Sequence, residues 1–101
     1  MNKLVITEQA YNDIDLIVGY ISNNNKPASK KILKLLHQAC YLLVEFPNIG
    51  IKRPDFTYKN IMFYIVAKKY LIAYQIKQNE VLILRILSAY QDICSLFWLL
   101  L

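Results

Sequence analysis

The stretch from Tyr58 to Leu87 places the tightest constraint on the fold. It holds three runs of β-branched and aromatic residues without Gly or Pro, at residues 58–66, 70–76 and 81–87, as strand interiors prefer. The links between them are short and polar, which favours antiparallel hairpins. Apolar residues occupy both faces of the last two runs, so the predicted sheet needs a cover on each side. This chain can supply one cover, which leaves the other face for a partner.

Two helical patterns precede this stretch. After a short apolar strand at residues 4–6, Thr7 offers an N-cap hydroxyl for a first helix that ends near Ser22. Its apolar positions are Ala10, Ile14, Ile17 and Ile21. A second helix follows a polar link, with Pro27 at its first position and Pro47 after its end. Its predicted buried stripe consists of Ala28, Ile32, Leu35, Ala39, Leu42 and Phe46.

The order of these elements defines the fold class. Strand, helix, helix and three strands (β-α-α-β-β-β) predict an α+β fold, in which an antiparallel helical hairpin packs on a small, mostly antiparallel sheet. Residues 51–55 are predicted to be an irregular basic segment that leads into the sheet. A chain of 101 residues is expected to form one domain over 1–101, with an apolar tail at 93–101.

Charge and cysteine content limit the partners and the compartment. Twelve Lys and Arg residues against seven Asp and Glu give a net charge of +5, which fits nucleic acid, a nucleic-acid enzyme or an acidic protein. Cys40 and Cys94 are far apart, so two reduced thiols that pack as small apolar groups are expected. The chain has no signal-peptide pattern and its tail is too short to cross a bilayer, so we expect a cytoplasmic protein without membrane contact.

Most catalytic patterns are absent from the sequence. His37 is the only histidine, and its place in the second helix favours a solvated side chain. One His and two scattered Cys cannot form a zinc site, and two glycines provide no phosphate-binding loop, so no metal and no cofactor is expected. Asp13 and Asp15 point to different sides of a helix, which argues against an acid–base pair.

The remaining candidates are basic or phenolic: Lys52, Arg53, Lys59, Arg85, Tyr90 and Gln91. Arg85 is the most informative, because strand alternation places it on one face with Val81, Ile83 and Leu87. Its tip therefore needs a carboxylate, a phosphate or solvent. The structural alternative is an arginine at the rim that reaches water or pairs within the chain.

Two other clusters favour structural roles. Lys30, Lys31 and Lys34 form the densest run of charge, where a solvated helix face is favoured over a nucleic-acid patch. Tyr64, Tyr70 and Tyr74 lie on predicted strands, where packing is favoured over the stacking of bases.

Six short strings follow one another between residues 3 and 93. They are Ala10 through Asp15-Leu-Ile17 to Tyr20-Ile21, Pro27-Ala28, Leu43-x-x-Phe46-Pro47-x-x-Gly50-x-x-Arg53, Tyr70-Leu-Ile-Ala-Tyr74, Val81-Leu-Ile-Leu-Arg85-Ile-Leu87 and Asp92-Ile93. In this order they resemble the ParE/RelE superfamily of type II toxin–antitoxin toxins, and specifically its ParE-like branch. The resemblance implies the fold predicted above and a partner antitoxin, whose extended C-terminal segment wraps the toxin and covers apolar surface.

The resemblance also implies two alternative activities. ParE-like toxins are associated with inhibition of DNA gyrase through binding, without hydrolytic chemistry, and RelE-like members cleave messenger RNA in the ribosome. Under the first hypothesis the target- or partner-binding residues are Arg53, Lys59, Arg85, Gln91, Phe97 and Trp98. Under the second, Arg53, Lys59, Arg85 and Tyr90 bind phosphate and transfer protons. Sequence-specific DNA binding is not expected under either.

The chain departs from the family pattern at three positions. Family members often end the last strand with a His-Gly-x-Arg-Asp type string, whereas this chain has Ser88 and Gln91 at the His and Arg positions. Phe63 stands where a basic residue is common. These departures weigh against ribonuclease activity, and they leave a third hypothesis: a non-toxic member that only binds an antitoxin.

Overall fold

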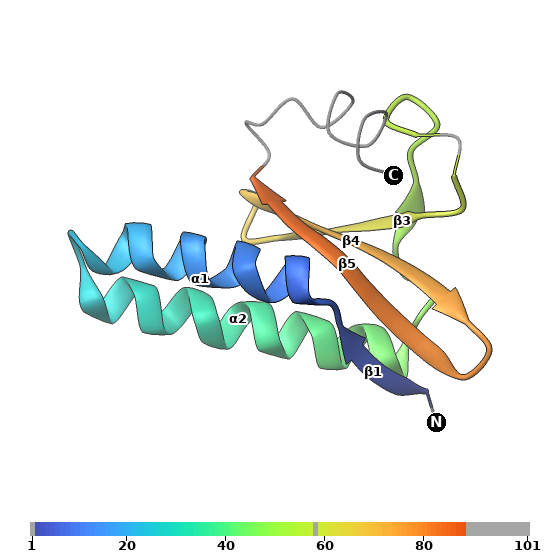
Figure 1. Ribbon diagram of the computed structural model, residues 1–101, viewed down its shortest axis with the longest axis horizontal. Coiled ribbons are helices and arrows are strands. Elements are labelled where there is room, and N and C mark those ends of the chain that lie inside the picture. Colours follow the sequence, from blue (N-terminus) through green and yellow to red (C-terminus); the bar gives the residue numbers. More distant parts are fainter. Residues whose placement is uncertain (1, 58, 89–101) are drawn as a thin grey trace.

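The computed structural model describes residues 2–57 and 59–88, which form two helices and a five-stranded sheet (Figure 1). The elements are β1 (Lys3–Ile6), α1 (Glu8–Ser22), α2 (Lys26–Glu45), β2 (Ile51–Lys52), β3 (Met62–Val66), β4 (Tyr70–Lys77) and β5 (Glu80–Ser88). The strands are ordered β1-β5-β4-β3-β2. Only β1 and β5 pair in parallel, and the other neighbours are antiparallel. The predicted α+β fold is therefore confirmed.

The helices begin at capping residues, and α2 ends before a proline. The hydroxyl of Thr7 accepts a hydrogen bond from the Ala10 amide at 3.2 Å, and the Asn25 side chain accepts one from the Ala28 amide at 3.1 Å. Pro27 is the second residue of α2, one position later than predicted, where its missing N–H is still harmless. The second helix ends just before Pro47, as predicted.

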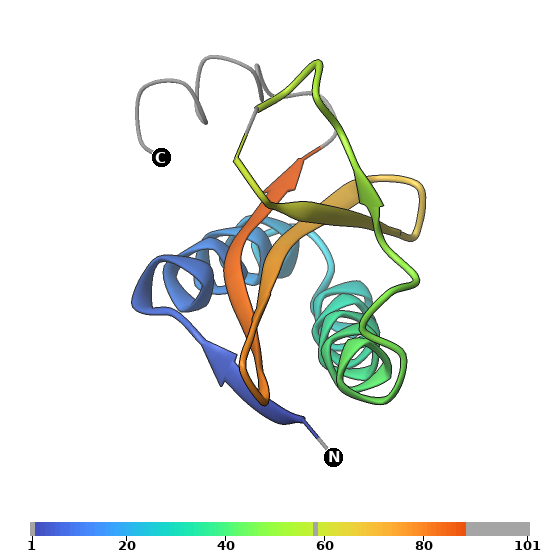
Figure 2. The same ribbon diagram turned by 90° about the vertical axis from the view of Figure 1, so that its right-hand side faces the viewer.

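Both helices lie side by side on one face of the sheet (Figures 1 and 2). Between the helices and the sheet lies a first core cluster, whose buried members include Ala10 and Ile14 of α1, Leu36, Cys40 and Leu43 of α2, and Val66, Ile72, Tyr74, Val81, Ile83 and Ile86 of the strands. Cys40 is fully buried there, so the prediction that its thiol packs as a small apolar group is confirmed.

The predicted buried stripe of α2 was only partly right. Ala39 is buried, but Leu42 and Phe46 are exposed, and the helix is buried around Leu36 and Leu43 instead. Steps of three and four residues fit both sets, since α2 is apolar over a wide arc. Its packing against α1 and the sheet together selects the second set, which leaves Leu42 facing β3.

A second core cluster covers the other face of the sheet. Its buried members are Ile61, Phe63, Leu71, Ala73 and Leu87, with Phe56 and Leu84 packed against them. The ring of Phe56 meets that of Phe63 edge-on, with the ring centroids 5.5 Å apart. The prediction that the sheet is apolar on both faces is confirmed. The expectation that a partner must cover the second face is wrong, because these side chains are buried within the chain itself.

The start of the sheet differs from the prediction. Residues 51–55 were expected to be irregular, but Ile51 and Lys52 form the short edge strand β2, which pairs with Phe63 and Met62. The next strand begins at residue 62 rather than 58, because the chain first turns after Arg53, whose carbonyl accepts hydrogen bonds from the amides of residues 56 and 57. The last two predicted strands are confirmed, and each is slightly longer than expected.

A register shift in β5 overturns the predicted environment of Arg85. Tyr74 pairs with Ile83 and Ala73 pairs with Arg85, so Leu84 is an extra residue in the strand. Such a bulge reverses the alternation of side chains beyond it. Val81 and Ile83 accordingly belong to the first cluster and Leu87 to the second, so the prediction that Arg85 shares a face with all three is wrong.

Candidate functional site

Arg85 is held by Asp13 of α1. Its Nε and Nη2 atoms donate hydrogen bonds of 2.7 and 3.0 Å to the two carboxylate oxygens of Asp13. The side chains are 19% and 12% exposed, so the pair is largely shielded from solvent. The hydrogen bonds to Asp13 raise the pKa of Arg85 above its ordinary value. Of the alternatives for the tip of Arg85, the structure therefore shows pairing with a carboxylate of the same chain.

The edge of β5 explains why Asp13 lies at this position. Parallel pairing with β1 covers β5 only as far as Ile83, because the chain enters α1 after residue 6. Beyond that point the side chains of α1 and its cap replace β1. The Thr7 hydroxyl donates to the carbonyls of Ile83 and Leu84, and Asp13 accepts the Ile86 amide at 3.0 Å. Asp13 thus binds both the backbone and the side chain of the strand that carries Arg85.

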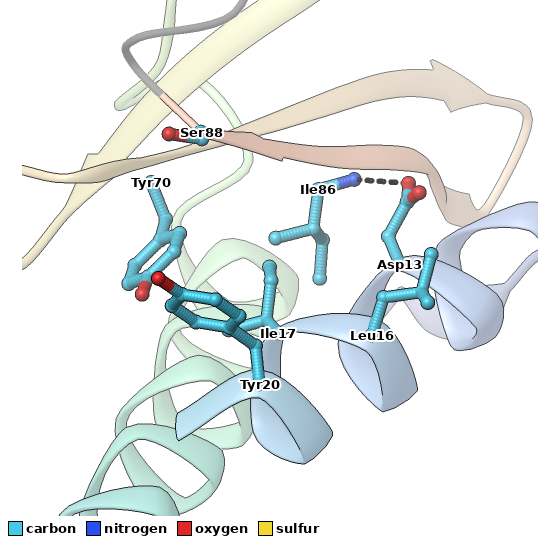
Figure 3. A pocket seen from close by; sticks show the side chains of 7 residues that line it. All are labelled: Asp13, Leu16, Ile17, Tyr20, Tyr70, Ile86 and Ser88. Atoms are coloured by element: carbon cyan, nitrogen blue, oxygen red, sulfur yellow. Dashed lines mark hydrogen bonds between the residues drawn. The ribbon is translucent and has the colours of Figure 1, made fainter. Parts of the chain in front are cut away.

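A groove extends from this ion pair along α1 (Figure 3). Its volume is about 380 Å³, and its lining residues are Asp13, Leu16, Ile17 and Tyr20 of α1, Tyr70 of β4, and Ile86 and Ser88 of β5. Asp13 lies at one end and the rings of Tyr20 and Tyr70 lie at the other. Leu16 and Tyr20, one helical turn apart, are 73% and 76% exposed, so they form an apolar border of the groove at the surface. This groove is a candidate partner-binding surface that the sequence did not reveal.

Arg53 is engaged in a different cluster, directly after β2. Its Nε and Nη2 atoms donate hydrogen bonds of 2.9 and 2.7 Å to the carboxylate of Asp55. Its guanidinium carbon lies 4.0 Å from the centre of the Phe56 ring, in cation–π geometry. The hydrogen bond from Arg53 lowers the pKa of Asp55. Since Phe56 packs on the second core cluster, Arg53 is fixed to the far side of the sheet from the helices.

The other predicted site residues are placed as follows. Lys59 has an exposed side chain, and its backbone amide donates to the Thr57 hydroxyl at 3.1 Å. Lys52 is exposed on the edge strand β2. Tyr90, Gln91, Phe97 and Trp98, together with the predicted tail at 93–101, lie outside the described residues. His37 is exposed on α2, as predicted, and Lys30, Lys31 and Lys34 are exposed as well.

The two arginines are therefore not joined into one site by the described contacts. Each forms a two-pronged pair with its own carboxylate, Asp13 for Arg85 and Asp55 for Arg53. The role of Asp13 was not predicted from the sequence, although a signal was present. It lies three residues after Ala10 and four before Ile17, at the border of the buried stripe, where a carboxylate can reach a strand arginine.

Comparison with known proteins identifies the family. The model of the ParE toxin of the type II toxin–antitoxin system parDE matches residues 4–93. The chain belongs to the ParE toxin family. Membership in this family implies an antitoxin partner, since its toxins are defined as parts of toxin–antitoxin systems. A search of curated proteins found no match to this ParE-family chain.

A solved structure agrees with this ParE-family fold. The chain superimposes on a protein of the chromosomal ParDE toxin–antitoxin system of P. aeruginosa with a TM-score of 0.73, at 23% sequence identity, over 85% of this chain and 94% of that one. It also resembles a conserved hypothetical protein of Helicobacter pylori, with a TM-score of 0.49 at 16% identity, over 90% of this chain and 98% of that one. Among the described residues, no helix is both long and apolar enough to span a membrane.

Proposed function

We propose that this ParE-family chain is a cytoplasmic toxin that inhibits DNA gyrase by binding to it, and that a cognate antitoxin neutralises it. The match to the ParE toxin model over residues 4–93 carries this proposal. The chemistry of the two arginines supports binding rather than hydrolysis. Arg53 and Arg85 already donate their two-pronged hydrogen bonds to carboxylates of the chain.

The ribonuclease hypothesis would need these arginines to act on a phosphate. Asp13 and Asp55 occupy the same guanidinium atoms that a phosphate would contact, and each adds a negative charge beside the proposed site. The raised pKa of Arg85 also makes it a poorer proton donor. A binding function needs no such group, because exposed apolar and basic side chains suffice for a protein interface.

The deciding experiment measures gyrase and ribosome activity in parallel. Purified chain is added to a gyrase supercoiling reaction and, separately, to a translation reaction with labelled message. Inhibition of supercoiling or accumulation of cleaved DNA complexes, with intact message, is the expected result. Cut message with normal supercoiling would establish the ribonuclease hypothesis instead. If neither activity changes at stoichiometric excess, the chain is a non-toxic family member and the proposal is wrong.

One test variant and two control variants extend this experiment. Lys59→Glu reverses an exposed charge in the β2–β3 connection and is expected to weaken gyrase inhibition at least fivefold, whereas Lys77→Glu at the exposed end of β4 leaves it within twofold. Gly50→Val, which would place a side chain against Tyr74, is expected to yield unfolded protein that reports non-specific inhibition.

A further inference from the structure

Exposed lysines gather on the side of the molecule that α2 and the β3–β4 turn form. Three of them follow one another at intervals of four residues along α2, so they form a row on one face of the helix that spans about 12 Å. A fourth lies beside this row, and two more belong to the turn. Together they form the lysine surface, whose members are Lys26, Lys30, Lys34, Lys31, Lys68 and Lys69.

The helix and the turn present their lysines on the same side of the molecule. One hollow, with a volume of about 360 Å³, is lined both by Leu35 of α2 and by Ala67 of the turn. Lys31 lies one helical turn before Leu35, and Lys68 follows Ala67 directly. Figure 2 shows the turn (gold) above α2 (cyan to green). A single partner can therefore contact the lysines of both elements.

No carboxylate of the described chain neutralises the lysine surface. Among the described residues, carboxylates pair only with the two arginines, so none of the six lysines has an acidic partner. The described acidic residues lie on α1, at the end of α2, after β2 and at the start of β5: Glu8, Asp13, Asp15, Glu45, Asp55 and Glu80. A group of positive charges without internal partners attracts a polyanion.

The side chains between the lysines indicate which polyanion fits. No large apolar side chain of α2 is exposed between residues 26 and 38. Protein interfaces use exposed apolar side chains at their centre, and single-stranded nucleic acids use exposed aromatic rings on which their bases stack. A lysine contacts a phosphate as a point charge, without such side chains. The lysine surface therefore fits the phosphate backbone of a duplex better than a protein or a single strand.

We propose that the lysine surface binds the phosphate backbone of duplex DNA without reading its sequence. The inference rests on the proposed function in one respect: gyrase acts on duplex DNA, which favours DNA over an RNA duplex as the source of the phosphates. A DNA duplex carries one negative charge per about 1.7 Å of its axis, so a row of about 12 Å lies beside about seven charges. Because the lysines project from two elements, a straight duplex meets about four of them at once.

The test measures binding of the purified chain to a fluorescent duplex of about 20 base pairs by anisotropy. With about four phosphate contacts, the logarithm of the binding constant should fall against the logarithm of the salt concentration with a slope of about −3.6. Affinity is therefore expected to drop about 100-fold between about 0.05 and 0.2 M salt, and equally for two unrelated sequences. Absence of binding at the lower salt concentration would overturn the inference. A tighter complex with one of the separated strands would also overturn it.

Matched variants locate the contact. Lys30→Gln/Lys34→Gln is expected to reduce the magnitude of the salt slope by about two and to weaken binding at least tenfold, and Lys68→Gln in the turn to reduce the slope by about one. Lys3→Gln/Lys77→Gln removes two exposed charges from β1 and β4 and should leave the slope unchanged. All five side chains are exposed, and circular dichroism verifies that each variant folds. An equal loss in the control would mean that net charge alone causes binding, which would overturn the inference.

Two further probes separate DNA from other polyanions. They are an RNA duplex of the same sequence and a polyglutamate of equal total charge. We expect both to bind more weakly than the DNA duplex. An RNA duplex that binds as tightly, or a polyglutamate that displaces the DNA at equal charge concentration, would overturn the assignment to DNA.

The outcomes also separate this inference from the proposed function. If supercoiling is inhibited but the chain binds no duplex, the inference is wrong and the proposed function stands. If the lysine surface binds DNA but supercoiling and message are both unaffected, the DNA-binding surface stands and the gyrase target is wrong.

Discussion

Asp13 and Arg85 lie 72 positions apart in the chain, and two hydrogen bonds of 2.7 and 3.0 Å join them. This pair fastens α1 to the part of β5 that β1 does not reach. It also determines the role of Arg85, which the sequence indicated as the most informative candidate residue. Arg85 has a structural role. A target can contact only the small part of the Arg85 side chain that remains exposed beside Asp13.

The first prediction concerns this ion pair. Asp13→Ala leaves the Arg85 guanidinium and the Ile86 amide without their carboxylate partner in a largely buried place, so we expect a loss of about 3 kcal/mol in the free energy of unfolding. Asp15→Ala alters an exposed neighbour and should cost less than about 0.5 kcal/mol. Urea unfolding measures both. A coupling near zero in the Asp13→Ala/Arg85→Ala cycle would refute the pairing.

A second prediction concerns Gly50 and Tyr74. The fully buried Tyr74 donates its hydroxyl proton to the Pro47 carbonyl at 2.7 Å and accepts the Gly50 amide at 2.9 Å. A Cβ at Gly50 would lie 2.3 Å from that hydroxyl oxygen and 2.7 Å from a ring carbon. Gly50→Ala is therefore expected to cost more than about 3 kcal/mol, and Tyr74→Phe about 1–2 kcal/mol.

The chain offers a matched control for the Gly50 substitution. Gly19 lies inside α1, and a Cβ there would meet nothing within 4 Å. Because Ala is the better helix former, Gly19→Ala should stabilise the protein by about 0.5–1 kcal/mol. Thermal unfolding distinguishes the two substitutions by sign. A stabilising Gly50→Ala would contradict the contact with Tyr74.

A third prediction concerns the β3–β4 turn. The Lys69 amide donates to the Val66 carbonyl at 3.1 Å, and the two residues between them, Ala67 and Lys68, have φ of 54° and 59°. This is a type I′ turn, for which Asn-Gly is the favoured sequence. Replacing both residues by Asn-Gly should raise the free energy of unfolding by about 1 kcal/mol.

The control for the turn is the next residue. Lys69 is not in the left-handed region, so Lys69→Gly gains no relief of strain and loses chain entropy. It should lower the melting temperature, whereas Asn-Gly at positions 67 and 68 should raise it by about 4–8 °C. An Asn-Gly variant that melts below the wild type would refute the assignment of the turn.

Much of this fold follows from local sequence signals, and the predictions that were wrong share a cause. Thr7, Asn25 and Pro47 each affect backbone groups within a few residues of their own position, so the helix limits could be predicted. The bulge at Leu84 could not, because it depends on how β5 pairs with β4. That single shift placed Leu87 on the opposite face from Val81 and Ile83, so no face holds Arg85 together with all three.

In the candidate site, too, local features could be predicted and tertiary contacts could not. Chemistry alone indicated that Arg85 needs a partner at its tip, and the structure supplies it. The identity of Asp13 required the packing of α1 beside the end of β1, which no local pattern encodes. The edge strand β2 was also missed, because its two residues form a strand only by pairing with Met62 and Phe63.

The last prediction concerns stability at alkaline pH. Burial raises the pKa of the Cys40 thiol to about 11, compared with 9.0 for an exposed thiol. Between these values the unfolded chain releases the thiol proton and the native chain retains it. Stability from this group is therefore complete below pH 9 and is lost as the pH rises toward 11. The loss should amount to about 3 kcal/mol.

A variant isolates the contribution of this thiol. In a Cys94→Ala background, where Cys40 is the only cysteine, urea unfolding is measured at intervals from pH 8 to 11. Cys40→Ala should flatten the curve between pH 9 and 10. Above pH 10 a slope remains, because burial also raises the pKa of Tyr74. An unchanged slope between pH 9 and 10 would mean that Cys40 is not shielded in the native protein.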